Sequence, residues 1–460
     1  MSNLYQRKVN TTELDSDSNN NNLTDQFTKN EHERTNNQKK QFEINSNASE
    51  EEMEPLPSNP SGETMPQDTG NVEVLDSALK ELNPRWRNYM VRFLFTWIMI
   101  FGFGFVVYLG PLAITILILA IQVKCFHEII TIGYVVYKSH HLPWFRTISW
   151  YFLITSNYYL YGESLIEKFS LLLRRHDFLM TFVTYHRFIS FSMYTAGFVA
   201  FVLTLKKTYY LKQFTLFGYT HLALLLIVTQ SNLMIQNVFD GLIWFLLPVS
   251  LIICNDIMAY MFGFFFGKTR LIKLSPKKTW EGFIGGAFST IVFGFLMSSI
   301  LIKYKRFVCP LEYDSNSQSV TDECEPSNIF KIATYNLPRP FIYFMPNLKV
   351  YMHPFQIHAL ALSIFASTIG PFGGFFASGF KRAFKIKDFG DTIPGHGGFM
   401  DRFDCQVIMA TFVNVYIYSF IRTPSPNKLF NQLLAFKHED QMEFFRMIST
   451  HFPNVNVNMN

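Results

Sequence analysis

The chain has 460 residues, of which 49% are hydrophobic and 17% are aromatic. Only 16% are charged, against roughly 25% in soluble domains, and the formal net charge is +5. This balance excludes an ordinary soluble domain and gives no reason to expect nucleic acid as a partner. A basic side could still face anionic lipid head groups or a nucleoside triphosphate.

Residues 1–82 are polar and low in complexity, and they are rich in Asn, Ser and Glu. Such a segment cannot bury enough apolar surface to offset the loss of chain entropy, which predicts a disordered tail. No apolar run opens the chain, so we expect no cleaved signal peptide.

Apolar runs follow the tail, most of them near the length of about 20 residues that a helix needs to cross a bilayer. They predict an all-α polytopic integral membrane protein with about nine transmembrane helices. The tight Gly110-Pro111 joint between the first two runs predicts a helical hairpin. In chain order the runs are Phe93–Leu109, Pro111–Ile132, Ile148–Leu160, Phe188–Leu205, Phe214–Thr229, Gly241–Tyr260, Phe283–Ile302, Ile357–Phe376 and Val407–Phe420.

Three ionisable residues, Lys124, His127 and Glu128, lie within or at the end of the second run. Ionisable groups at such depth usually face a protein interior or a wet cavity. For Glu128 we favour an interfacial helix end, and a place in an active cavity is the alternative.

A polar motif begins inside the sixth run with Asp256 and continues with Ser-Pro-Lys-Lys-Thr-Trp-Glu-Gly from Ser275 onward. A carboxylate after a long apolar run needs a cation, a metal or a water-filled cleft. Ser275 and Pro276 have the chemistry of an N-cap and a first helical residue, which predicts a helix start. Its free N–H groups, with Lys277 and Lys278, would bind an anion. Anchoring to lipid head groups is the alternative.

Residues 378–404 place cations ahead of carboxylates, with a Gly-His-Gly-Gly turn between them. Cations neutralise phosphate oxygens, carboxylates hold Mg²⁺, and glycines let backbone N–H groups approach an anion. The stretch therefore predicts a site for phosphates and a divalent metal, and a solvated loop between two helices is the alternative. Just before it, the run Gly370-Pro371-Phe372-Gly373-Gly374 is predicted to break the eighth helix. The charged residues of the stretch 378–404 that we single out are Lys381, Arg382, Lys385, Lys387, Asp388, Asp391, Asp401, Arg402 and Asp404.

This stretch resembles the signature of the CDP-diacylglycerol synthases, also called phosphatidate cytidylyltransferases, of the eukaryotic type. It contains Ser378-x-Phe380-Lys381-Arg382, Lys387-Asp388, Pro394-x-His396-Gly397-Gly398 and Asp401-Arg402-x-Asp404. The Asp256 motif is similar to a second motif of that family, and the two occur in the expected order. The family makes CDP-diacylglycerol and pyrophosphate from CTP and phosphatidate. The resemblance extends more loosely from about Arg85 onward and implies a transmembrane catalytic domain over residues 83–422.

The reaction implied by the resemblance is nucleotidyl transfer, in which an oxygen of the phosphatidate phosphate attacks the α-phosphorus of CTP. Catalysis would rest on charge neutralisation and positioning, with Mg²⁺ as the cofactor and a second cation as a further option. We expect catalytic roles for Lys381, Arg382, His396, Asp401, Arg402 and Asp404. We expect substrate binding by Ser275, Lys277, Lys278, Lys387, Gly397 and Gly398. We expect metal ligands among Asp256, Asp388, Asp401 and Asp404, with Asp401 as the first choice.

The resemblance also implies CTP, phosphatidate and membrane lipids as partners, and it leaves a homodimer open. It implies a location in the endoplasmic reticulum membrane, and because CTP is cytosolic we expect the active site and the N-terminal tail to face the cytosol. One position departs from the family pattern, because bacterial members carry an acidic metal ligand four residues before Ser378, where this chain has Gly374. We interpret the glycine as a difference between subtypes that leaves Asp256 or Asp388 as substitute ligands.

Two other functions compete with this one. A CTP-dependent lipid kinase of the dolichol kinase kind would share CTP, Mg²⁺ and the membrane, but it attacks the γ-phosphorus. A transporter with an anion site would use the same loops, although the sequence contains no convincing internal repeat.

Two features remain outside the motifs. Cys309 and Cys324 share one polar loop that this topology puts in the lumen, and a disulfide or two free thiols are both open. Residues 423–460 mix apolar, basic and acidic residues. Between Asn427 and Phe452 they predict an amphipathic helix that lies on the membrane.

Overall fold

The computed structural model describes residues 84–136, 144–174, 177–314, 319–321, 324–336, 349–393, 397–422, 429–430, 433–434 and 436–451. The predicted tail, residues 1–82, lies outside the described residues, as does the proposed catalytic His396. The described chain is mostly helical, and its strands form three two-stranded antiparallel pairs.

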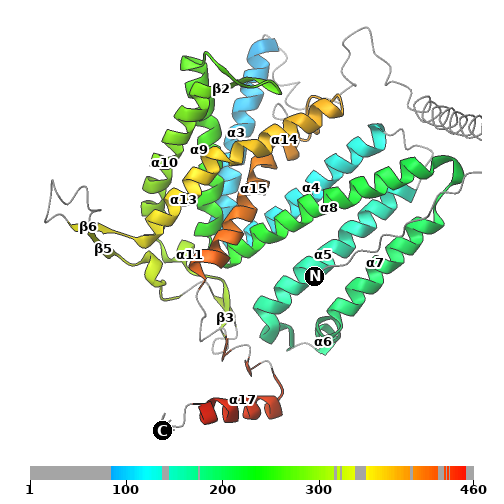
Figure 1. Cartoon of the computed structure of the whole chain (residues 1–460), viewed down its shortest axis with the longest axis vertical. Helices are drawn as coiled ribbons and strands as arrows, with labels where there is room; N and C mark the ends of the chain where they lie inside the picture. Colours follow the sequence, from blue (N-terminus) through cyan, green and yellow to red (C-terminus); the bar gives the residue numbers. More distant parts are fainter. Residues whose placement is uncertain are drawn as a thin grey trace, which may run out of the picture. The chain divides into compact units, whose positions relative to one another are not determined.

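Helices dominate because a backbone inside lipid has no water to satisfy its N–H and C=O groups. The α-helices are α3 (Pro84–Leu109), α4 (Pro111–Val136), α5 (Trp144–Arg174), α6 (Asp177–Thr184), α7 (His186–Leu203), α8 (Tyr210–Phe239), α9 (Ile243–Phe266), α10 (Trp280–Leu301), α11 (Lys305–Val308), α13 (Pro354–Thr368), α14 (Gly370–Ala383), α15 (Met400–Tyr416) and α17 (His438–His451) (Figure 1). Two 3₁₀-helices, η2 (Lys207–Tyr209) and η3 (Asn328–Phe330), and a π-helix, η4 (Ile417–Ile421), complete the helical elements.

Eight helical segments in the described part of the chain are long and apolar enough to cross a membrane. They agree with eight of the nine predicted runs and confirm the all-α polytopic class. The segments are Met90–Leu109, Pro111–Val136, His186–Leu203, Lys207–Phe239, Ile243–Phe266, Trp280–Leu301, Pro354–Ala383 and Met400–Ile421.

The remaining predicted run lies in α5, which has 31 residues but does not belong to this apolar set. Two of its polar side chains form hydrogen bonds to neighbouring helices. Asn157 accepts a hydrogen bond of 2.6 Å from Gln122 of α4, and Ser164 donates one of 3.0 Å to Asn232 of α8. Polar contacts of this kind join helices inside lipid, so the lower apolarity of α5 has a structural reason.

The two predicted breaks are confirmed. Gly110 separates α3 from α4 with a φ of +108°, a conformation that glycine adopts readily, and the two helices pack together. The second break lies at Ile369, one residue before the predicted run, and residues 370–374 form the first turns of α14. The second break leads directly into the helix that carries the signature cations.

Three segments contact one another near the C-terminal end of α15, which is the end farther from the signature. The guanidinium of Arg306 packs on Gly110, where an added Cβ would lie 2.8 Å from its Nη2 atom. The N–H of Leu311 donates to the carbonyl of Phe239 at 2.9 Å. The α3–α4 turn, the end of α8 and the segment after α10 therefore lie together, away from the signature.

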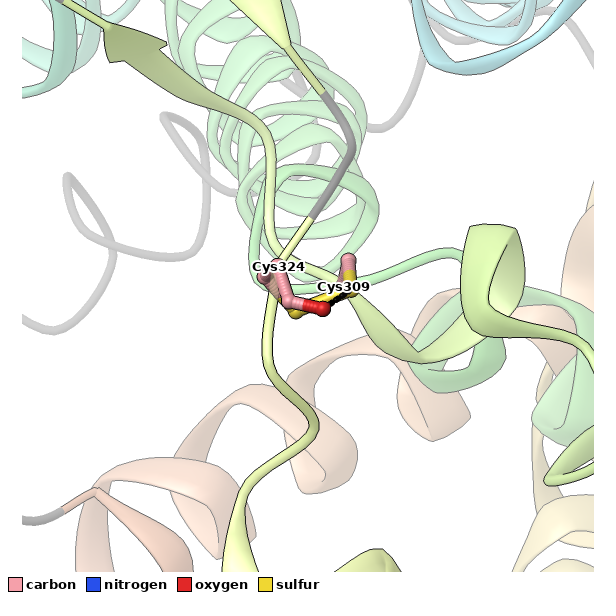
Figure 2. Close-up of a disulfide and its surroundings, with 2 residues drawn as sticks. All are labelled: Cys309 and Cys324. Atoms are coloured by element: carbon pink, nitrogen blue, oxygen red, sulfur yellow. Dashed lines mark hydrogen bonds between the residues drawn. A yellow bond between two sulfur atoms is a disulfide. The ribbon is translucent and has the colours of Figure 1, made fainter.

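A disulfide joins Cys309 to Cys324 in the segment after α10, so the bonded alternative is the correct one (Figure 2). The bond closes a loop that contains the pair formed by β3 (Glu312–Asp314) and β4 (Ser319–Thr321). Farther along the chain, β5 (Ala333–Asn336) pairs with β6 (Lys349–Met352) and leads into α13.

The predicted helix start at Ser275 is wrong. Residues Ser275–Thr279 form strand β2, which pairs with β1 (Arg270–Ile272), and helix α10 begins at Trp280. Thr279 is the N-cap, because its hydroxyl accepts a hydrogen bond of 3.2 Å from the N–H of Gly282. Pro276 allows both structures, since its fixed φ fits an extended edge strand as well as a first helical turn.

Candidate active site

The two sequence motifs meet where α14 and α15 pack beside α9 and strand β2 (Figure 1). The ammonium of Lys278 on β2 lies 5.2 Å from the centre of the Phe375 ring on α14. Gly373 allows α14 to approach α15 closely, because a Cβ there would lie 2.5 Å from the carbonyl oxygen of Asp404. Residues almost a hundred positions apart thus share one site.

An ion pair between Lys381 and Asp401 joins α14 to the first turn of α15. The Nζ and Oδ1 atoms are 2.6 Å apart, and the two side chains are 16% and 6% exposed. The other oxygen of Asp401 accepts hydrogen bonds from the N–H groups of Phe389 at 2.8 Å and Gly398 at 3.2 Å. Both carboxylate oxygens therefore have partners within the protein.

A second group of charges lies around Asp404 and Asp256. The two carboxylates interact electrostatically with each other, and Lys381 also acts on Asp404. Lys278 and Arg402 act on Asp256, whose side chain is exposed. The sequence required a cation, a metal or a wet cleft for Asp256, and the structure supplies the cations.

A third group lies on the loop between α14 and α15. Gly397, with a φ of +83°, turns the chain so that a Cβ would lie 3.5 Å from Oδ2 of Asp401 and 3.6 Å from Cγ of Asp388. Burial raises the pKa of Asp391, the carboxylate of Asp388 raises it further, and Lys387 lowers it. Asp388, Asp391 and Asp401 thus surround one turn of the loop.

The described residues fit Mg²⁺ only in combination with a substrate. No group of three or more His, Cys, Asp or Glu side chains among them is arranged to hold a metal ion. Mg²⁺ usually takes one or two carboxylates and completes its shell with phosphate oxygens and water. Asp256 and Asp404 offer two carboxylates beside cations that suit a phosphate. The ligand role of Asp401 stays a prediction, and the ion would displace hydrogen-bond partners there.

The predicted substrate-binding side chains differ in how they face the site. Neighbouring residues of a strand point to opposite faces, and on β2 Lys277 is exposed whereas Lys278 is half-buried near Asp256. Ser275, at the start of the same strand, is half-buried. On the signature side Arg382, Lys387 and Arg402 are exposed.

The predicted N–H donors of the glycine turn are engaged within the protein. The N–H of Gly397 donates to the carbonyl of Ile393 at 3.1 Å, and that of Gly398 donates to Asp401. The protein's own groups therefore shape this turn, and an anion would have to replace them to use these donors.

Comparison with known proteins places this site in a family. The model of the cytidylyltransferase family matches residues 90–420, which include both motifs. The chain belongs to the cytidylyltransferase family. It is 56% identical over 403 residues to phosphatidate cytidylyltransferase 2 of Bos taurus, covering 88% of this chain and 89% of the relative. It is 57% identical over 390 residues to phosphatidate cytidylyltransferase 1 of Homo sapiens, covering 85% and 84%. The Caenorhabditis elegans phosphatidate cytidylyltransferase is 56% identical over 393 residues, covering 84% of each chain.

Gly374 of this cytidylyltransferase lies beside the second charge group. A Cβ at this position would be 3.5 Å from Oδ2 of Asp404 and 3.2 Å from Sγ of Cys405. An acidic side chain there would therefore point at Asp404, and its absence leaves Asp404 and Asp256 as the carboxylates of that group.

Glu128 is the site residue that sequence reasoning placed wrongly. It is 5% exposed and its carboxylate accepts hydrogen bonds from the signature loop, so the interfacial helix end that we favoured is wrong and Glu128 is buried against the loop. The one signal in the sequence was an ionisable residue in an apolar run. Its neighbours Lys124 and His127 share that signal, so the sequence alone did not single it out.

Proposed function

We propose that this protein transfers the cytidylyl group of CTP to phosphatidate, giving CDP-diacylglycerol and pyrophosphate for phospholipid synthesis. The observation that carries the proposal is the 56–57% identity, over most of the chain, to proteins named phosphatidate cytidylyltransferase. The site supports it, because cations and carboxylates gather at the ends of membrane-spanning helices. The names of these relatives do not favour a dolichol-type kinase or a transporter.

The protein's part in the reaction is to hold two phosphates together. The phosphatidate oxygen is already anionic, so no strong general base is needed when it attacks the α-phosphorus and pyrophosphate leaves. Lys278 and Lys381 would neutralise phosphate oxygens from two sides of the site, which aligns the nucleophile and the leaving group. Arg382, Lys387 and Arg402 would add charge at the exposed rim. Mg²⁺ held by Asp256 and Asp404 would supply further neutralisation of phosphate charge.

The proposed orientation places the site in the cytosol and the disulfide loop in the lumen of the endoplasmic reticulum. The disulfide supports this assignment, since such bonds persist in oxidising compartments and it lies away from the signature. The site would then meet cytosolic CTP, while phosphatidate reaches it from the membrane. A homodimer stays an open prediction.

The test is turnover by the purified protein in detergent with CTP labelled at the α-phosphorus. We expect labelled CDP-diacylglycerol from phosphatidate, no product with dolichol, and one pyrophosphate for each lipid formed. Membranes from cells without the protein, purified in the same way, serve as the inactive control. Labelled CDP with an unlabelled phospholipid product would identify a kinase, and no turnover without sealed vesicles would favour transport.

A further inference from the structure

Glu128 of α4 is tied to the signature loop through three hydrogen bonds. Its Oε1 atom accepts one from the hydroxyl of Thr392 at 2.7 Å and one from the N–H of Phe399 at 2.9 Å. Its Oε2 atom accepts a third from the N–H of Met400 at 3.0 Å. The three donors lie 264, 271 and 272 positions away along the chain.

The loop is shaped around this carboxylate. A Cβ at Gly398 would lie 2.6 Å from Oε2 of Glu128 and 2.8 Å from the backbone nitrogen of Gly390. A Cβ at Gly390 would lie 3.1 Å from Oε1. Two glycines of the signature thus leave the space that Glu128 fills, and side chains there would push the loop away from α4.

The bonds to Phe399 and Met400 satisfy N–H groups at the start of α15. A helix leaves its first N–H groups without intrahelical partners, and the helix dipole favours a negative charge at that end. Glu128 supplies that charge from another helix. The next residue is Asp401, whose carboxylate holds Lys381. The position of Glu128 therefore fixes where the Asp401–Lys381 pair lies.

We propose that Glu128 is a positioning residue, which anchors the signature loop and the start of α15 so that Asp401 and Lys381 face the substrate phosphates. It acts through these residues and does not itself touch the substrate. The expected effect of Glu128 on turnover rests on the proposed function. Its effect on the loop does not depend on which reaction the protein catalyses.

Glu128→Gln tests the anchor with little change in volume. The amide keeps one acceptor oxygen and turns the other position into a donor, so it must face one of the three donors without a bond. Hydrogen–deuterium exchange of the peptide that spans residues 389–404 reads the loop directly. We expect exchange at Phe399 and Met400 to become at least about ten-fold faster than in the wild type.

Kinetics give the second readout. We expect kcat per folded molecule to fall about 10²-fold, the loss that a displacement of about 1 Å can cause, while KM for CTP changes much less. A purely structural role would lower the yield of folded protein and leave kcat per folded molecule unchanged. Gln122→Met is the matched control, because Gln122 is buried in the same helix and bonds to Asn157 and Tyr161 instead of the loop.

Thr392→Val is a milder variant that keeps Glu128 and removes one donor. If Glu128→Gln does not fold, Thr392→Val replaces it in the same measurements. We expect faster exchange at residues 399 and 400 than in the wild type and a smaller fall in kcat than for Glu128→Gln. Unchanged exchange and kcat in a folded Glu128→Gln or Thr392→Val protein would overturn the inference. A wild-type protein without transferase activity would overturn the proposed function instead, and the exchange comparison would still decide the role of Glu128.

Discussion

The ammonium of Lys381 lies 2.6 Å from Oδ1 of Asp401, and this ion pair connects the last turn of α14 to the first turn of α15. Both side chains are largely shielded from water, so each charge depends on the other. An arriving phosphate would compete with Asp401 for Lys381, and an arriving cation would compete with Lys381 for Asp401. In each case the other partner is released. The pair therefore keeps both groups in place for a substrate that carries negative charge.

The first prediction is that Asp401→Asn abolishes turnover while the protein remains folded in the membrane. The change removes one charge at nearly constant volume and removes the direct ion-pair partner of Lys381. Removing one partner of a buried pair costs about 3–5 kcal/mol, and the remaining exposure of Lys381 should reduce that cost. Steady-state kinetics and a thermal unfolding curve measure both effects. Near-normal kcat at saturating Mg²⁺ would remove Asp401 from the mechanism.

The second prediction separates two neighbouring lysines. Lys278 is half-buried, beside Asp256 and the Phe375 ring, whereas Lys277 is exposed on the other face of β2. A charge-assisted contact is worth roughly 1.5–3 kcal/mol, so Lys278→Gln should raise KM for CTP about ten-fold or more. Lys277→Gln is the matched control and should change KM for CTP little.

Lipid anchoring predicts a different result for the same variants. If the lysines only hold the β1–β2 pair to anionic head groups, CTP kinetics stay unchanged and the dependence on phosphatidate varies with the anionic lipid content. Assays in mixed micelles at several anionic lipid fractions distinguish the two. Equal effects of both substitutions on KM for CTP would contradict the difference in exposure.

Much of the fold could be predicted because its signals are local. Apolar runs reveal spans, and the Gly110-Pro111 and Gly370-Pro371 joints reveal breaks, since each is decided by adjacent residues. The strand at Ser275 could not be predicted in this way. Ser-Pro fits a helix start and an edge strand alike, and pairing with β1 decides between them.

The site could be predicted where its residues are close in sequence. The order of cations, glycines and carboxylates in residues 378–404 indicates phosphate and metal chemistry by itself, while the role of each side chain stays a prediction. Glu128 could not be assigned, because its three donors lie more than 260 positions away. Nothing near Glu128 in the sequence indicates that the signature loop folds over it.

The third prediction concerns the Cys309–Cys324 disulfide. A bond that closes a loop of about 15 residues contributes about 3 kcal/mol through chain entropy. Cys309→Ser should lower the free energy of unfolding by about that amount and leave kcat unchanged, because the loop lies away from the signature. Cys254→Ser, which removes a free and half-buried thiol, is the control.

The same cysteines test the orientation in the membrane. In sealed microsomes, a membrane-impermeant maleimide should label Cys324 of the Cys309→Ser variant only after the vesicles are permeabilised. Labelling of intact vesicles would place the loop on the cytosolic side and reverse the proposed topology.

The fourth prediction tests the metal through Gly374. Gly374→Asp would add a carboxylate beside Asp404, at the point where a Cβ lies 3.5 Å from its Oδ2 atom. Without a divalent cation, like charges at this distance repel, so Tm should fall below that of the wild type. If Mg²⁺ binds to Asp404, the added carboxylate should tighten its binding. Each ten-fold gain in affinity raises the Mg²⁺-dependent stabilisation by about 1.4 kcal/mol at saturation.

Gly379→Asp is the matched control, because it makes the same substitution on α14 at a position that faces Leu274. Thermal unfolding of both variants over a series of Mg²⁺ concentrations gives the comparison without relying on turnover. The Tm of Gly374→Asp should rise more steeply with Mg²⁺ than that of the wild type, and the Tm of Gly379→Asp should not. Equal slopes for the two variants would show that no divalent cation binds next to Asp404, and the ligands would then have to be sought around Asp388 and Asp401.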